Sequence, residues 1–419
     1  MTSSARSIVI VSSILPVTGG NGLAMRTSMF AQAAGQVGDT LCIVFGHNSA
    51  LLRNHPLPHN VSVCEIPVEV DTRLSLIIET IPAAHRAQAL LDYGRPSISV
   101  ALSAGVMNQI VQKLKHVQPD LVIISRAYTL PLLEIIDRGE QYQTPVVVDL
   151  DDDDAALHLS FADDEERQGN LILADWHRAE ATIFDNLIST HADRIRLLWA
   201  AGRQVEQSLR SRLNLTNVQI AANAVDLVEH AATTSDQECK NEQVLLFVGN
   251  LSYKPNHDGI CWFFTHIWPL LRAEVRKIKI VIAGSNCPAD VRKHCQHPDI
   301  KLIENPIDLG SIYHSATAAI VPLRFGSGSR LKILEAGAYG LPVISTDAGA
   351  RGLTLSVDDH LFQSPVDVFE FGKACIACLS SPDEAKRRSG LLRKFVSAHH
   401  DRKNVVEKLR HDIVDSLDT

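Results

Sequence analysis

The sequence predicts an α/β fold made of two parallel-sheet domains, and three observations support this class. Short apolar runs rich in β-branched residues alternate with longer helical segments along the chain. Nearly all of these runs are continuously apolar, as expected for strands buried on both faces of a parallel sheet. A polar stretch without periodicity, residues 233–242, separates two such series. The length of 419 residues also exceeds one ordinary core, so two domains are expected.

The predicted strands are spaced so that a helix fits between most of them, which is the pattern of βαβ units. In the first half they cover residues 8–12, 41–45, 121–125, 146–149, 187–189 and 218–221. In the second half they cover residues 245–249, 278–283, 300–303, 319–322 and 343–346. The chain is therefore divided into Rossmann-like domains at 1–226 and 244–385, a linker at 227–243 and terminal helices at 386–419.

The overall composition is that of a soluble globular protein, with 45% hydrophobic and 21% charged residues. A formal net charge of -8 argues against a nucleic-acid partner, which would need a basic face. No apolar run reaches the roughly 18 residues of a membrane span, and the first one is too short for a signal-peptide core. We therefore expect a cytoplasmic protein without a membrane span.

The eight cysteines are scattered, and most lie in apolar segments, where a thiol acts as a small hydrophobic group. Cys375 and Cys378 have CxxC spacing, but no second pair lies near them in sequence. An alternative is a zinc cluster made of Cys287, His294, Cys295 and His297. The spacing of these residues fits no zinc module. Reduced thiols and the absence of a metal site are the simpler expectation.

Residues 325–346 are the most informative segment, since a glycine-rich loop, a helix and a strand follow one another directly. Glycines let backbone N–H groups turn toward a ligand, and the first turn of a helix offers unpaired donors to phosphate. Arg330 and Lys332 add positive charge near the predicted helix start at Ser329. Glu335 can accept hydrogen bonds from two neighbouring hydroxyls. Together these features predict a site for a nucleotide-sugar.

The same region, from Val321 to Thr346, resembles the donor-binding motif of retaining GT-B glycosyltransferases of family 4. Shared features are the Pro-Leu pair, the glycine-rich loop, the lysine, the Glu-Ala pair and the Gly-x-Pro-Val run before the last strand. Residues 222–226 also resemble the Asn-Gly-Val-Asp hinge of these enzymes, with Ala224 in place of the glycine. The resemblance covers about residues 222–355 well and the first half only in outline.

This resemblance implies a GT-B fold, in which two Rossmann-like domains face a central cleft. The N-terminal domain would hold the acceptor, the C-terminal domain the nucleotide-sugar, and the terminal helices would pack back on the N-terminal domain. The implied activity is transfer of a sugar from a nucleotide diphosphate-sugar to a hydroxyl acceptor, with retention and without a metal or another cofactor. The acceptor would be a carbohydrate or a lipid-linked molecule in polysaccharide or glycoconjugate assembly. A nucleotide-sugar epimerase, an inverting transferase and a catalytically silent nucleotide-sugar-binding protein remain as alternatives.

The resemblance also assigns roles to individual residues. Lys332, Arg330 and Lys254 would stabilise charge on the leaving diphosphate and are the predicted catalytic residues. The predicted donor-binding residues lie in glycine-rich turns and on the helix: Gly20, Asn250, Gly326, Ser327, Gly328, Ser329 and Glu335. Asn250 replaces an arginine of many relatives, and Ser327 stands where a first glutamate often occurs. The ribose-binding acid therefore corresponds to Glu335, whereas the sugar-contacting acid of the family has no counterpart.

The first glycine-rich turn, residues 19–22, follows the first predicted strand and precedes a helix that contains Arg26. Such turns bring the backbone of an α/β protein close to a ligand. The resemblance implies that this turn meets the sugar or phosphate of the donor. A dinucleotide fingerprint is disfavoured because Met25 stands where a small residue is needed, and no ribose-binding acid follows the second strand. A plain turn without a ligand stays open.

Five carboxylates crowd the end of the strand predicted at 146–149, where the sequence reads Asp-Leu-Asp-Asp-Asp-Asp from Asp149 to Asp154. Close like charges raise one another's pKa, so such a cluster binds a cation or stays solvated. We interpret Asp149 and Asp151 as residues of the acceptor side. The alternatives are a metal-binding Asp-x-Asp motif, a haloacid-dehalogenase nucleophile motif and a solvated helix N-terminus. The first two do not explain residues 321–346.

Two further features stay without an assigned role. His47 and His191 are the nearest candidates for the cleft histidine of many relatives, but neither lies in a motif that aligns, so no catalytic histidine is predicted. Basic pairs in the last helices most simply form a solvated face. A peripheral contact with the inner membrane face is the alternative, because many relatives use lipid-linked acceptors.

Overall fold

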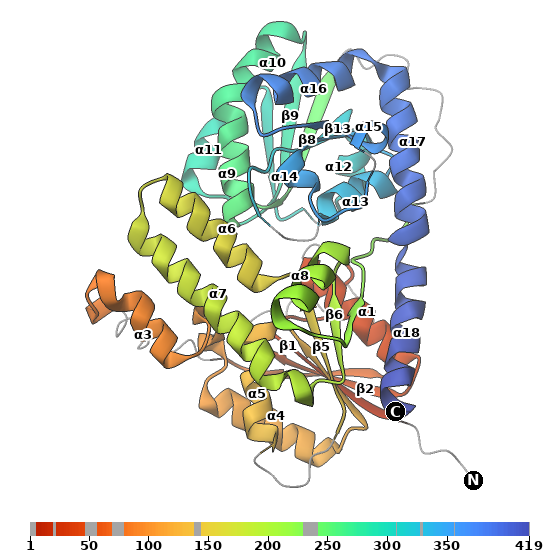
Figure 1. Ribbon diagram of the computed structural model, residues 1–419. Helices are drawn as coiled ribbons and strands as arrows, with labels where there is room; N and C mark the ends of the chain where they lie inside the picture. The colour runs from red at the N-terminus through yellow and green to blue at the C-terminus, as the bar shows by residue number, and fades with distance from the viewer. Residues whose placement is uncertain are drawn as a thin grey trace. The chain divides into compact units, whose positions relative to one another are not determined.

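The computed structural model describes most of the chain, drawn in Figure 1: residues 6–19, 22–46, 57–68, 79–137, 144–228, 242–306, 308–326, 330–355 and 357–418. These residues form two compact units. The first unit runs to Asn223 and resumes at Lys403, and the second lies between them. The polypeptide therefore passes between the units after Asn223 and again after Arg402.

The first unit is built on a parallel seven-stranded sheet in the order β3-β2-β1-β4-β5-β6-β7. Its strands are β1 (Ser7–Ser12), β2 (Asp39–Phe45), β3 (Val61–Ile66), β4 (Leu121–Ser125), β5 (Val146–Asp151), β6 (Leu197–Ala200) and β7 (Val218–Ile220). The strand order reverses between β1 and β4. In open α/β sheets, ligands bind beyond the carboxyl ends of the strands at such a reversal.

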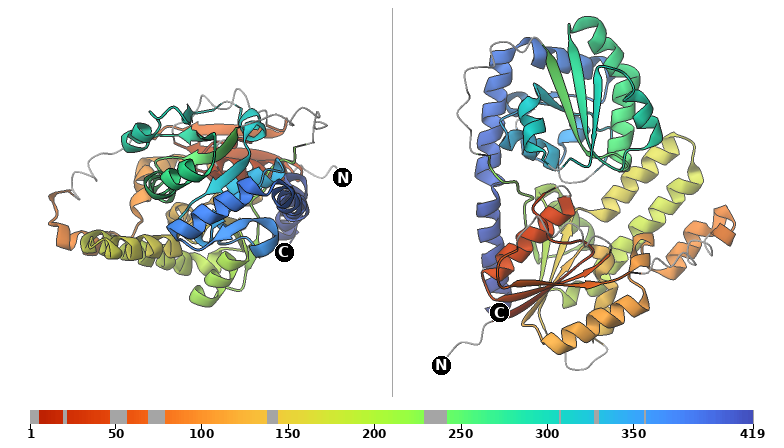
Figure 2. Two further views of the ribbon diagram at one scale, coloured as in Figure 1. Left: turned by 90° about the horizontal axis from the view of Figure 1, so that it is seen from above. Right: turned by 180° about the vertical axis from the view of Figure 1, so that it is seen from behind.

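Helices cover both faces of this sheet, as Figure 2 shows. One face carries α1 (Gly22–Gly35) and α18 (Arg402–Asp418). On that face the ring of Phe30 stacks on Trp199 at 5.0 Å, and the Trp199 indole N–H donates to Asp412 at 3.0 Å. The other face packs against α4 (Ala104–Val117), α5 (Pro131–Asp137) and α7 (Leu171–His191), which share one apolar core with the strands. The described residues of this unit also form α3 (Arg86–Tyr93), α6 (Asp154–Arg167) and α8 (Arg203–Leu213).

The second unit repeats this plan on a parallel six-stranded sheet in the order β10-β9-β8-β11-β12-β13. Its strands are β8 (Gln243–Asn250), β9 (Ile278–Ser285), β10 (Ile300–Glu304), β11 (Ala318–Val321), β12 (Val343–Thr346) and β13 (Phe362–Ser364). Here the order reverses between β8 and β11. Gly284 is required beside the end of β8, since a Cβ there would lie 1.8 Å from the carbonyl oxygen of Gly249.

The helices of the second unit again lie on both faces of its sheet (Figure 2). They are α9 (Lys254–Trp262), α10 (Trp268–Glu274), α11 (Ala289–His294), α12 (Gly310–Ser315), α13 (Leu331–Ala338), α14 (Asp347–Ala350), α15 (Val357–His360), α16 (Val368–Ser380) and α17 (Pro382–His399). A π-helical turn at Phe263–Ile267 joins α9 to α10. Helix α17 packs so closely on α13 that a Cβ on Gly337 would lie 2.8 Å from the Val396 side chain.

The two parallel sheets confirm the predicted α/β class, and ten of the eleven predicted strands overlap observed ones. The prediction at 187–189 is wrong, because these residues lie in α7, where apolar residues recur with helical spacing. Three observed strands were not predicted: β3, β6 and β13. Only the first and last residues of β3 are buried, and β13 is only three residues long, so neither shows the continuous apolar run used as the signal. The predicted terminal segment 386–419 spans most of α17, in the second unit, and α18, in the first.

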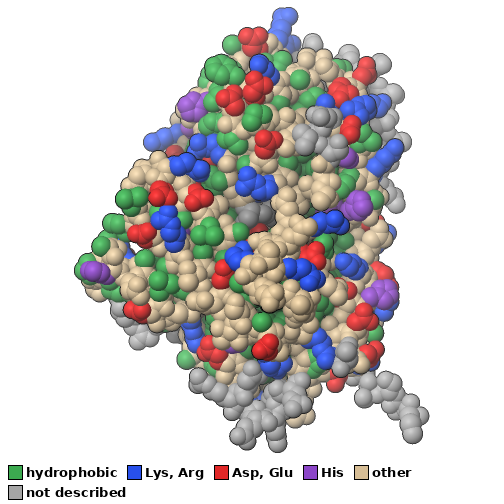
Figure 3. All heavy atoms as spheres, viewed as in Figure 1, with side chains coloured by type: hydrophobic (Ala, Val, Ile, Leu, Met, Phe, Trp, Pro, Cys, Tyr) green, Lys and Arg blue, Asp and Glu red, His purple; other side chains and the backbone are tan. Residues whose placement is uncertain are grey.

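Charged side chains of both signs are interspersed on the face drawn in Figure 3, rather than gathered by sign. Within the described part of the chain, no helix is long and apolar enough to cross a membrane. The interspersed charges do not form a large basic surface for a polyanion on the face drawn in Figure 3.

Candidate functional site

In the second unit, polar side chains gather at the reversal point of the sheet, beyond the ends of β8 and β11. Gly249 of β8 has no side chain, so it leaves room for these polar side chains. A Cβ on Gly249 would lie 2.9 Å from the Asn256 amide nitrogen and 3.5 Å from the Lys332 amine. A glycine here therefore lets α9 and α13 bring these two side chains against the end of the strand.

Lys332, on the first turn of α13, is the central cation of this group. Its amine donates to the Asn256 amide oxygen at 2.6 Å and lies 4.6 Å from the centre of the Phe247 ring. Burial lowers the pKa of Lys332 to about 7, with the charge of Arg330 adding to the decrease and Glu335 opposing it. Its charge is thus poorly compensated, so an anion beside the amine would stabilise it.

Asn256 was not assigned a role from the sequence, yet it joins three elements. Its side-chain amide donates to the backbone oxygen of Asn250 at 2.8 Å while its carbonyl accepts from Lys332. The side chain is buried. It therefore fixes the Lys332 amine relative to the β8–α9 turn. Its place two residues after Lys254, next to Pro255 at the start of a helix, was the available sequence signal.

Glu335 lies one turn after Lys332 on α13. One carboxylate oxygen accepts from the hydroxyl of Tyr313 at 2.9 Å, and the Tyr313 ring stacks on Tyr339 at 4.7 Å. Burial raises the pKa of Glu335, while the Tyr313 hydrogen bond and Lys332 oppose that rise. The stacked tyrosines thus hold a carboxylate beside the lysine, on the same side of α13.

Arg330 precedes α13 and is buried, with its guanidinium turned onto the backbone. It donates to the carbonyl oxygens of Gly326 at 2.6 Å, Ala348 at 2.8 Å and Arg351 at 3.1 Å. These bonds tie the end of the glycine-rich loop to the segment after β12. Its observed contacts are therefore those of a loop anchor, and its predicted contact with the diphosphate stays a prediction.

The other predicted residues of the β8–α9 turn lie nearby. The Asn250 side chain accepts from the Ser252 backbone N–H at 3.1 Å and from the Ser252 hydroxyl at 2.9 Å, so it stabilises its own turn. Lys254 begins α9, and its amine lies 5.8 Å from the centre of the Phe325 ring. Both residues thus border the same strand end as Lys332.

Several predicted residues lie outside the described part of the chain: Gly20, Ser327, Gly328, Ser329 and the alternative histidine His47. Gly326, the described start of the loop, has a φ of 109°, a conformation that favours glycine. His191, the other histidine, is buried at the end of α7.

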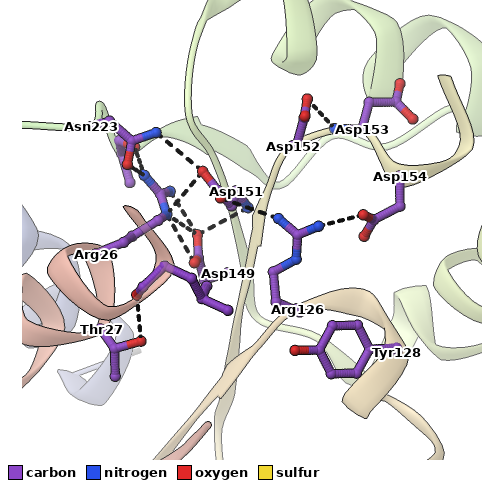
Figure 4. A network of polar contacts seen from close by, with 12 residues as sticks. Arg26, Thr27, Arg126, Tyr128, Asp149, Asp151, Asp152, Asp153, Asp154 and Asn223 are labelled. Atoms are coloured by element: carbon purple, nitrogen blue, oxygen red, sulfur yellow. Dashed lines mark hydrogen bonds and ion pairs between the residues drawn. The ribbon is translucent and has the colours of Figure 1, made fainter. Parts of the chain in front are cut away.

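In the first unit, the strand ends at the corresponding reversal point carry paired charges (Figure 4). Arg26 of α1 and Asp149 of β5 are fully buried and form a bidentate ion pair, with nitrogen–oxygen distances of 2.6–2.9 Å. Arg26 also donates to the backbone of Ala221 at 2.7 Å and to Asn223 at 3.1 Å. Burial acts to lower the pKa of Arg26, but the Asp149 and Asp151 carboxylates raise it above its ordinary value.

Arg126 follows the end of β4 and Asp151 is the last residue of β5, and both have positive φ values, 75° and 56°. Such conformations cost energy in residues other than glycine and often occur at functional sites. The Arg126 guanidinium donates to Asp151 at 3.1 Å, and the Asn223 amide donates to the other Asp151 oxygen at 3.1 Å. Asn223, from the segment that resembles a hinge, is thus fixed to the end of β5.

Asp154 begins α6 and differs from the other carboxylates of the cluster. One oxygen accepts from Arg126, and the other is buried without a hydrogen-bond partner among the described residues. Burial raises the pKa of Asp154 to about 7, against the opposing charge of Arg126 and with help from the neighbouring carboxylates. A carboxyl group of this kind can accept or donate a proton near neutral pH.

The predicted acceptor-side residues therefore occupy different surroundings. Asp149 is fully buried, and its carboxylate is paired with Arg26. The Asp151 side chain is 14% exposed. One carboxylate oxygen of Asp154 is buried without a hydrogen-bond partner among the described residues. Their acceptor-side role stays a prediction. The sequence interpretation missed Arg26 and Arg126 as partners of this cluster, because they lie far from it along the chain.

The metal alternatives weighed from the sequence are not assembled among the described residues. Neither the Asp149–Asp154 cluster nor the cysteine–histidine set at 287–297 brings three ligand atoms within metal-binding distance. Instead His294 stacks on Phe264 at 5.0 Å, and His297 accepts from the backbone of Asp299 at 3.2 Å.

Comparison with known proteins finds a family match within the second unit. Residues 242–381 match the family model described as glycosyl transferases group 1. The matched segment contains Lys332, Glu335, Asn256 and Tyr313. An uncharacterized 44.6 kDa protein in the cps region of Klebsiella pneumoniae is 28% identical over 173 residues, which are 39% of this chain and 44% of that protein. The chain thus spans less than half the length of this curated relative.

Solved structures extend the similarity to nearly the whole chain. Alr3699/HepE of Anabaena in complex with UDP-glucose has a TM-score of 0.64 and 14% identity, covering 98% of this chain and 99% of that one. Sucrose-phosphate synthase of Thermosynechococcus elongatus has a TM-score of 0.69 and 14% identity, covering 98% of both chains. A glycosyltransferase of Rickettsia africae has a TM-score of 0.66 and 13% identity, covering 100% of both chains. These similarities show that the two units have the GT-B fold.

Proposed function

We propose that this chain is a retaining glycosyltransferase that moves a sugar from a nucleotide diphosphate-sugar to a hydroxyl acceptor. The observation that carries the proposal is the pairing of Lys332 and Glu335 on one side of α13, inside the segment that matches the family model. A cation with little compensation suits a diphosphate, and a carboxylate one turn away suits the hydroxyls of a ribose.

The donor we propose first is a UDP-sugar. A structural neighbour, HepE of Anabaena, is described in complex with UDP-glucose, although its identity to this chain is only 14%. In the proposed complex, Lys332 and Lys254 contact the diphosphate, Glu335 contacts the ribose, and backbone N–H groups at 326–329 surround the phosphates. No further cofactor is proposed.

The proposed chemistry breaks the bond between the anomeric carbon and the diphosphate oxygen. Protonated Lys332 donates a hydrogen bond to the leaving diphosphate, where negative charge develops, and so stabilises the transition state more than the ground state. The acceptor oxygen bonds to the anomeric carbon on the face that the diphosphate leaves. Its proton passes to the leaving diphosphate oxygen, so no separate base is required and no metal is invoked.

An inverting transferase is the second candidate, because the first unit offers a candidate base. Asp154 combines a buried oxygen without a partner and a pKa raised by burial to about 7. A carboxylate there can accept the acceptor's proton during attack from the face opposite the leaving group. The configuration of the product, read by NMR, separates the two reactions. Retention of the anomeric configuration would exclude the inverting transferase, and inversion would exclude the retaining transferase.

The proposed acceptor is a carbohydrate or a lipid-linked molecule, and the proposed setting is polysaccharide or glycoconjugate assembly. The relative in the cps region of Klebsiella pneumoniae motivates this choice. A cytoplasmic location, with a peripheral membrane contact as the alternative, belongs to the same proposal. Flotation of the protein with anionic lipid vesicles tests that contact, which is rejected if the protein stays in the dense fraction.

A screen of nucleotide-sugars by thermal shift is the first experiment, since it identifies the donor before the acceptor is known. We expect one nucleotide diphosphate-sugar to stabilise the wild-type protein and Glu335→Ala to weaken its binding about tenfold, or ~1.4 kcal/mol. A protein that binds the donor but neither transfers nor hydrolyses it would be the catalytically silent alternative. Wild-type binding by Glu335→Ala would contradict the site assignment.

A further inference from the structure

A group of three side chains on another part of the second unit meets the requirements of a metal site. His257 and Cys261 lie four residues apart on α9, so they project from the same face of the helix. Asp290 lies on the first turn of α11, which packs beside α9 (Figure 1). The imidazole nitrogen, the thiol sulfur and a carboxylate oxygen all lie within 4.8 Å of one another. No other set among the described residues meets this condition.

The distances are close to those between ligands of a tetrahedral ion. The His257 Nε2 lies 2.7 Å from the Asp290 Oδ2, and the Cys261 Sγ lies 3.9 Å from the same oxygen. The bond lengths of a tetrahedral zinc site separate nitrogen and oxygen ligands by about 3.3 Å and sulfur and oxygen ligands by about 3.5 Å. These two pairs therefore need to adjust by only about 0.6 Å or less, and the His257 and Cys261 ligand atoms lie within 4.8 Å of each other.

The orientation of Asp290 also suits a ligand. Its Oδ1 accepts from the Val291 backbone N–H at 2.9 Å, which leaves Oδ2 facing α9. Such a bond to the outer oxygen is the usual support of a metal-binding carboxylate. The Asp290 side chain is 54% exposed and that of His257 is 35% exposed, so an ion can enter from solvent.

We propose that His257, Cys261 and Asp290 bind one divalent transition-metal ion, with zinc as the chemically favoured occupant. Nitrogen, sulfur and carboxylate ligands suit zinc, whereas magnesium and calcium prefer all-oxygen sites. Water completes the coordination of the ion. The site is separate from the donor residues, so the proposal does not depend on the proposed transfer reaction.

The bound ion links α9 to α11 and stabilises their packing. The first turn of α9 carries Lys254 and Asn256, and Asn256 holds the Lys332 amine. Fixing α9 therefore stabilises the turn that borders the donor residues. Bound metal raises the thermal stability of the folded protein, because the unfolded chain does not assemble the three ligands.

Titration of tag-free, chelator-treated full-length protein with Co²⁺ alone tests the proposal. Tetrahedral cobalt bound to a thiolate has intense visible bands and a sulfur-to-cobalt charge-transfer band in the near ultraviolet. We expect one Co²⁺ per chain, displacement by Zn²⁺, and a rise in the thermal midpoint with either ion. We expect loss of the charge-transfer band in Cys261→Ser and at least about tenfold weaker binding in His257→Gln and Asp290→Asn.

Matched cysteine variants make the outcome decisive. Cys287 and Cys295 are also partly exposed thiols of the second unit, so Cys287→Ser and Cys295→Ser must keep the band. The metal-free thermal midpoint of Cys261→Ser must equal that of the metal-free wild type, which excludes misfolding as the cause of lost binding. The proposal is overturned if the wild type gives no cobalt–thiolate band. It is equally overturned if the band survives in Cys261→Ser or disappears only in a control variant.

Discussion

The two sheets of this protein follow the same strand order around their reversal points. The cations at these points are paired with carboxylates in the first unit, but Lys332 of the second unit is not. In the first unit, buried arginines pair with carboxylates: Arg26 with Asp149, and Arg126 with Asp151 and Asp154. In the second unit, Lys332 gives its hydrogen bond to a neutral amide, and its pKa is lowered by burial to about 7. The second unit therefore has a cation that an anionic ligand would stabilise, whereas the first unit has already neutralised its own.

This difference teaches that strand order fixes where a ligand can bind but not which ligand binds there. The poorly compensated lysine suits the diphosphate of the proposed donor. The arginines of the first unit are held by carboxylates. The second carboxylate oxygen of Asp154, which has no hydrogen-bond partner among the described residues, suits a hydroxyl group. Four experiments can break or sharpen this division between the units.

The largest expected effect is on stability, from Asp149→Asn in the first unit. This substitution leaves the Arg26 charge buried without its carboxylate partner, and breaking such a pair costs ~3–5 kcal/mol. Urea unfolding should show the loss as a lower midpoint. Glu166→Gln, which removes a carboxylate from an exposed pair with Arg178, is the matched control and should change the midpoint little. Equal losses in both variants would mean that the buried pair is not the anchor of this unit.

The next effect is on catalysis, from Lys332→Ala in the second unit. Loss of the cation should lower kcat/KM about 100-fold, or ~2.7 kcal/mol, because the charge on the leaving diphosphate loses a donor. Lys301→Ala removes an exposed lysine of the same sheet and should leave transfer unchanged. Steady-state kinetics with the donor found by screening give both values. If Lys332→Ala transfers the sugar as well as the wild type, Lys332 is not the cation that stabilises the diphosphate, and the contrast between the units fails.

The residues of the two sites differ in how far the sequence could predict them. Lys332 and Glu335 lie in one continuous segment, so their pattern is visible without a fold. The pair of Arg26 and Asp149 joins positions 123 residues apart, and Asn223 lies 197 residues from Arg26. Only the parallel order of β1, β4 and β5 brings these positions together, and no local pattern encodes it.

Local geometry limited the prediction even within the continuous segment. The sequence indicated two cations beside the phosphate, but the Arg330 guanidinium contacts three backbone carbonyls. Tyr313 and Asn256 were missed because each acts through a neighbour, on Glu335 and on Lys332. Most strands were predictable where burial on both faces gave continuous apolar runs, but the fully buried run of β6 was missed. The same rule failed for β3, in which only the first and last residues are buried.

The pH dependence of donor binding sharpens the comparison further. Burial lowers the pKa of Lys332 to about 7, so the amine is protonated below that pH and loses its charge above it. The diphosphate binds the protonated form, and affinity should therefore fall about fivefold between pH 7 and pH 8. Calorimetric titration of the donor at several pH values measures this change. Lys332→Ala should abolish the dependence, and a dependence that persists in this variant would assign it to another group.

The smallest expected effect comes from removing one hydroxyl from each unit. Tyr313→Phe deletes the hydrogen bond that orients Glu335 and opposes the rise of its pKa, while the stacked ring remains. Donor affinity should fall about threefold, or ~0.7 kcal/mol. Tyr128→Phe is the counterpart in the first unit, where the hydroxyl bonds Ser13 at 2.6 Å, and it should leave donor affinity unchanged. If both variants weaken donor binding equally, the donor is not held by the second unit alone, and the assignment of one ligand to each sheet fails.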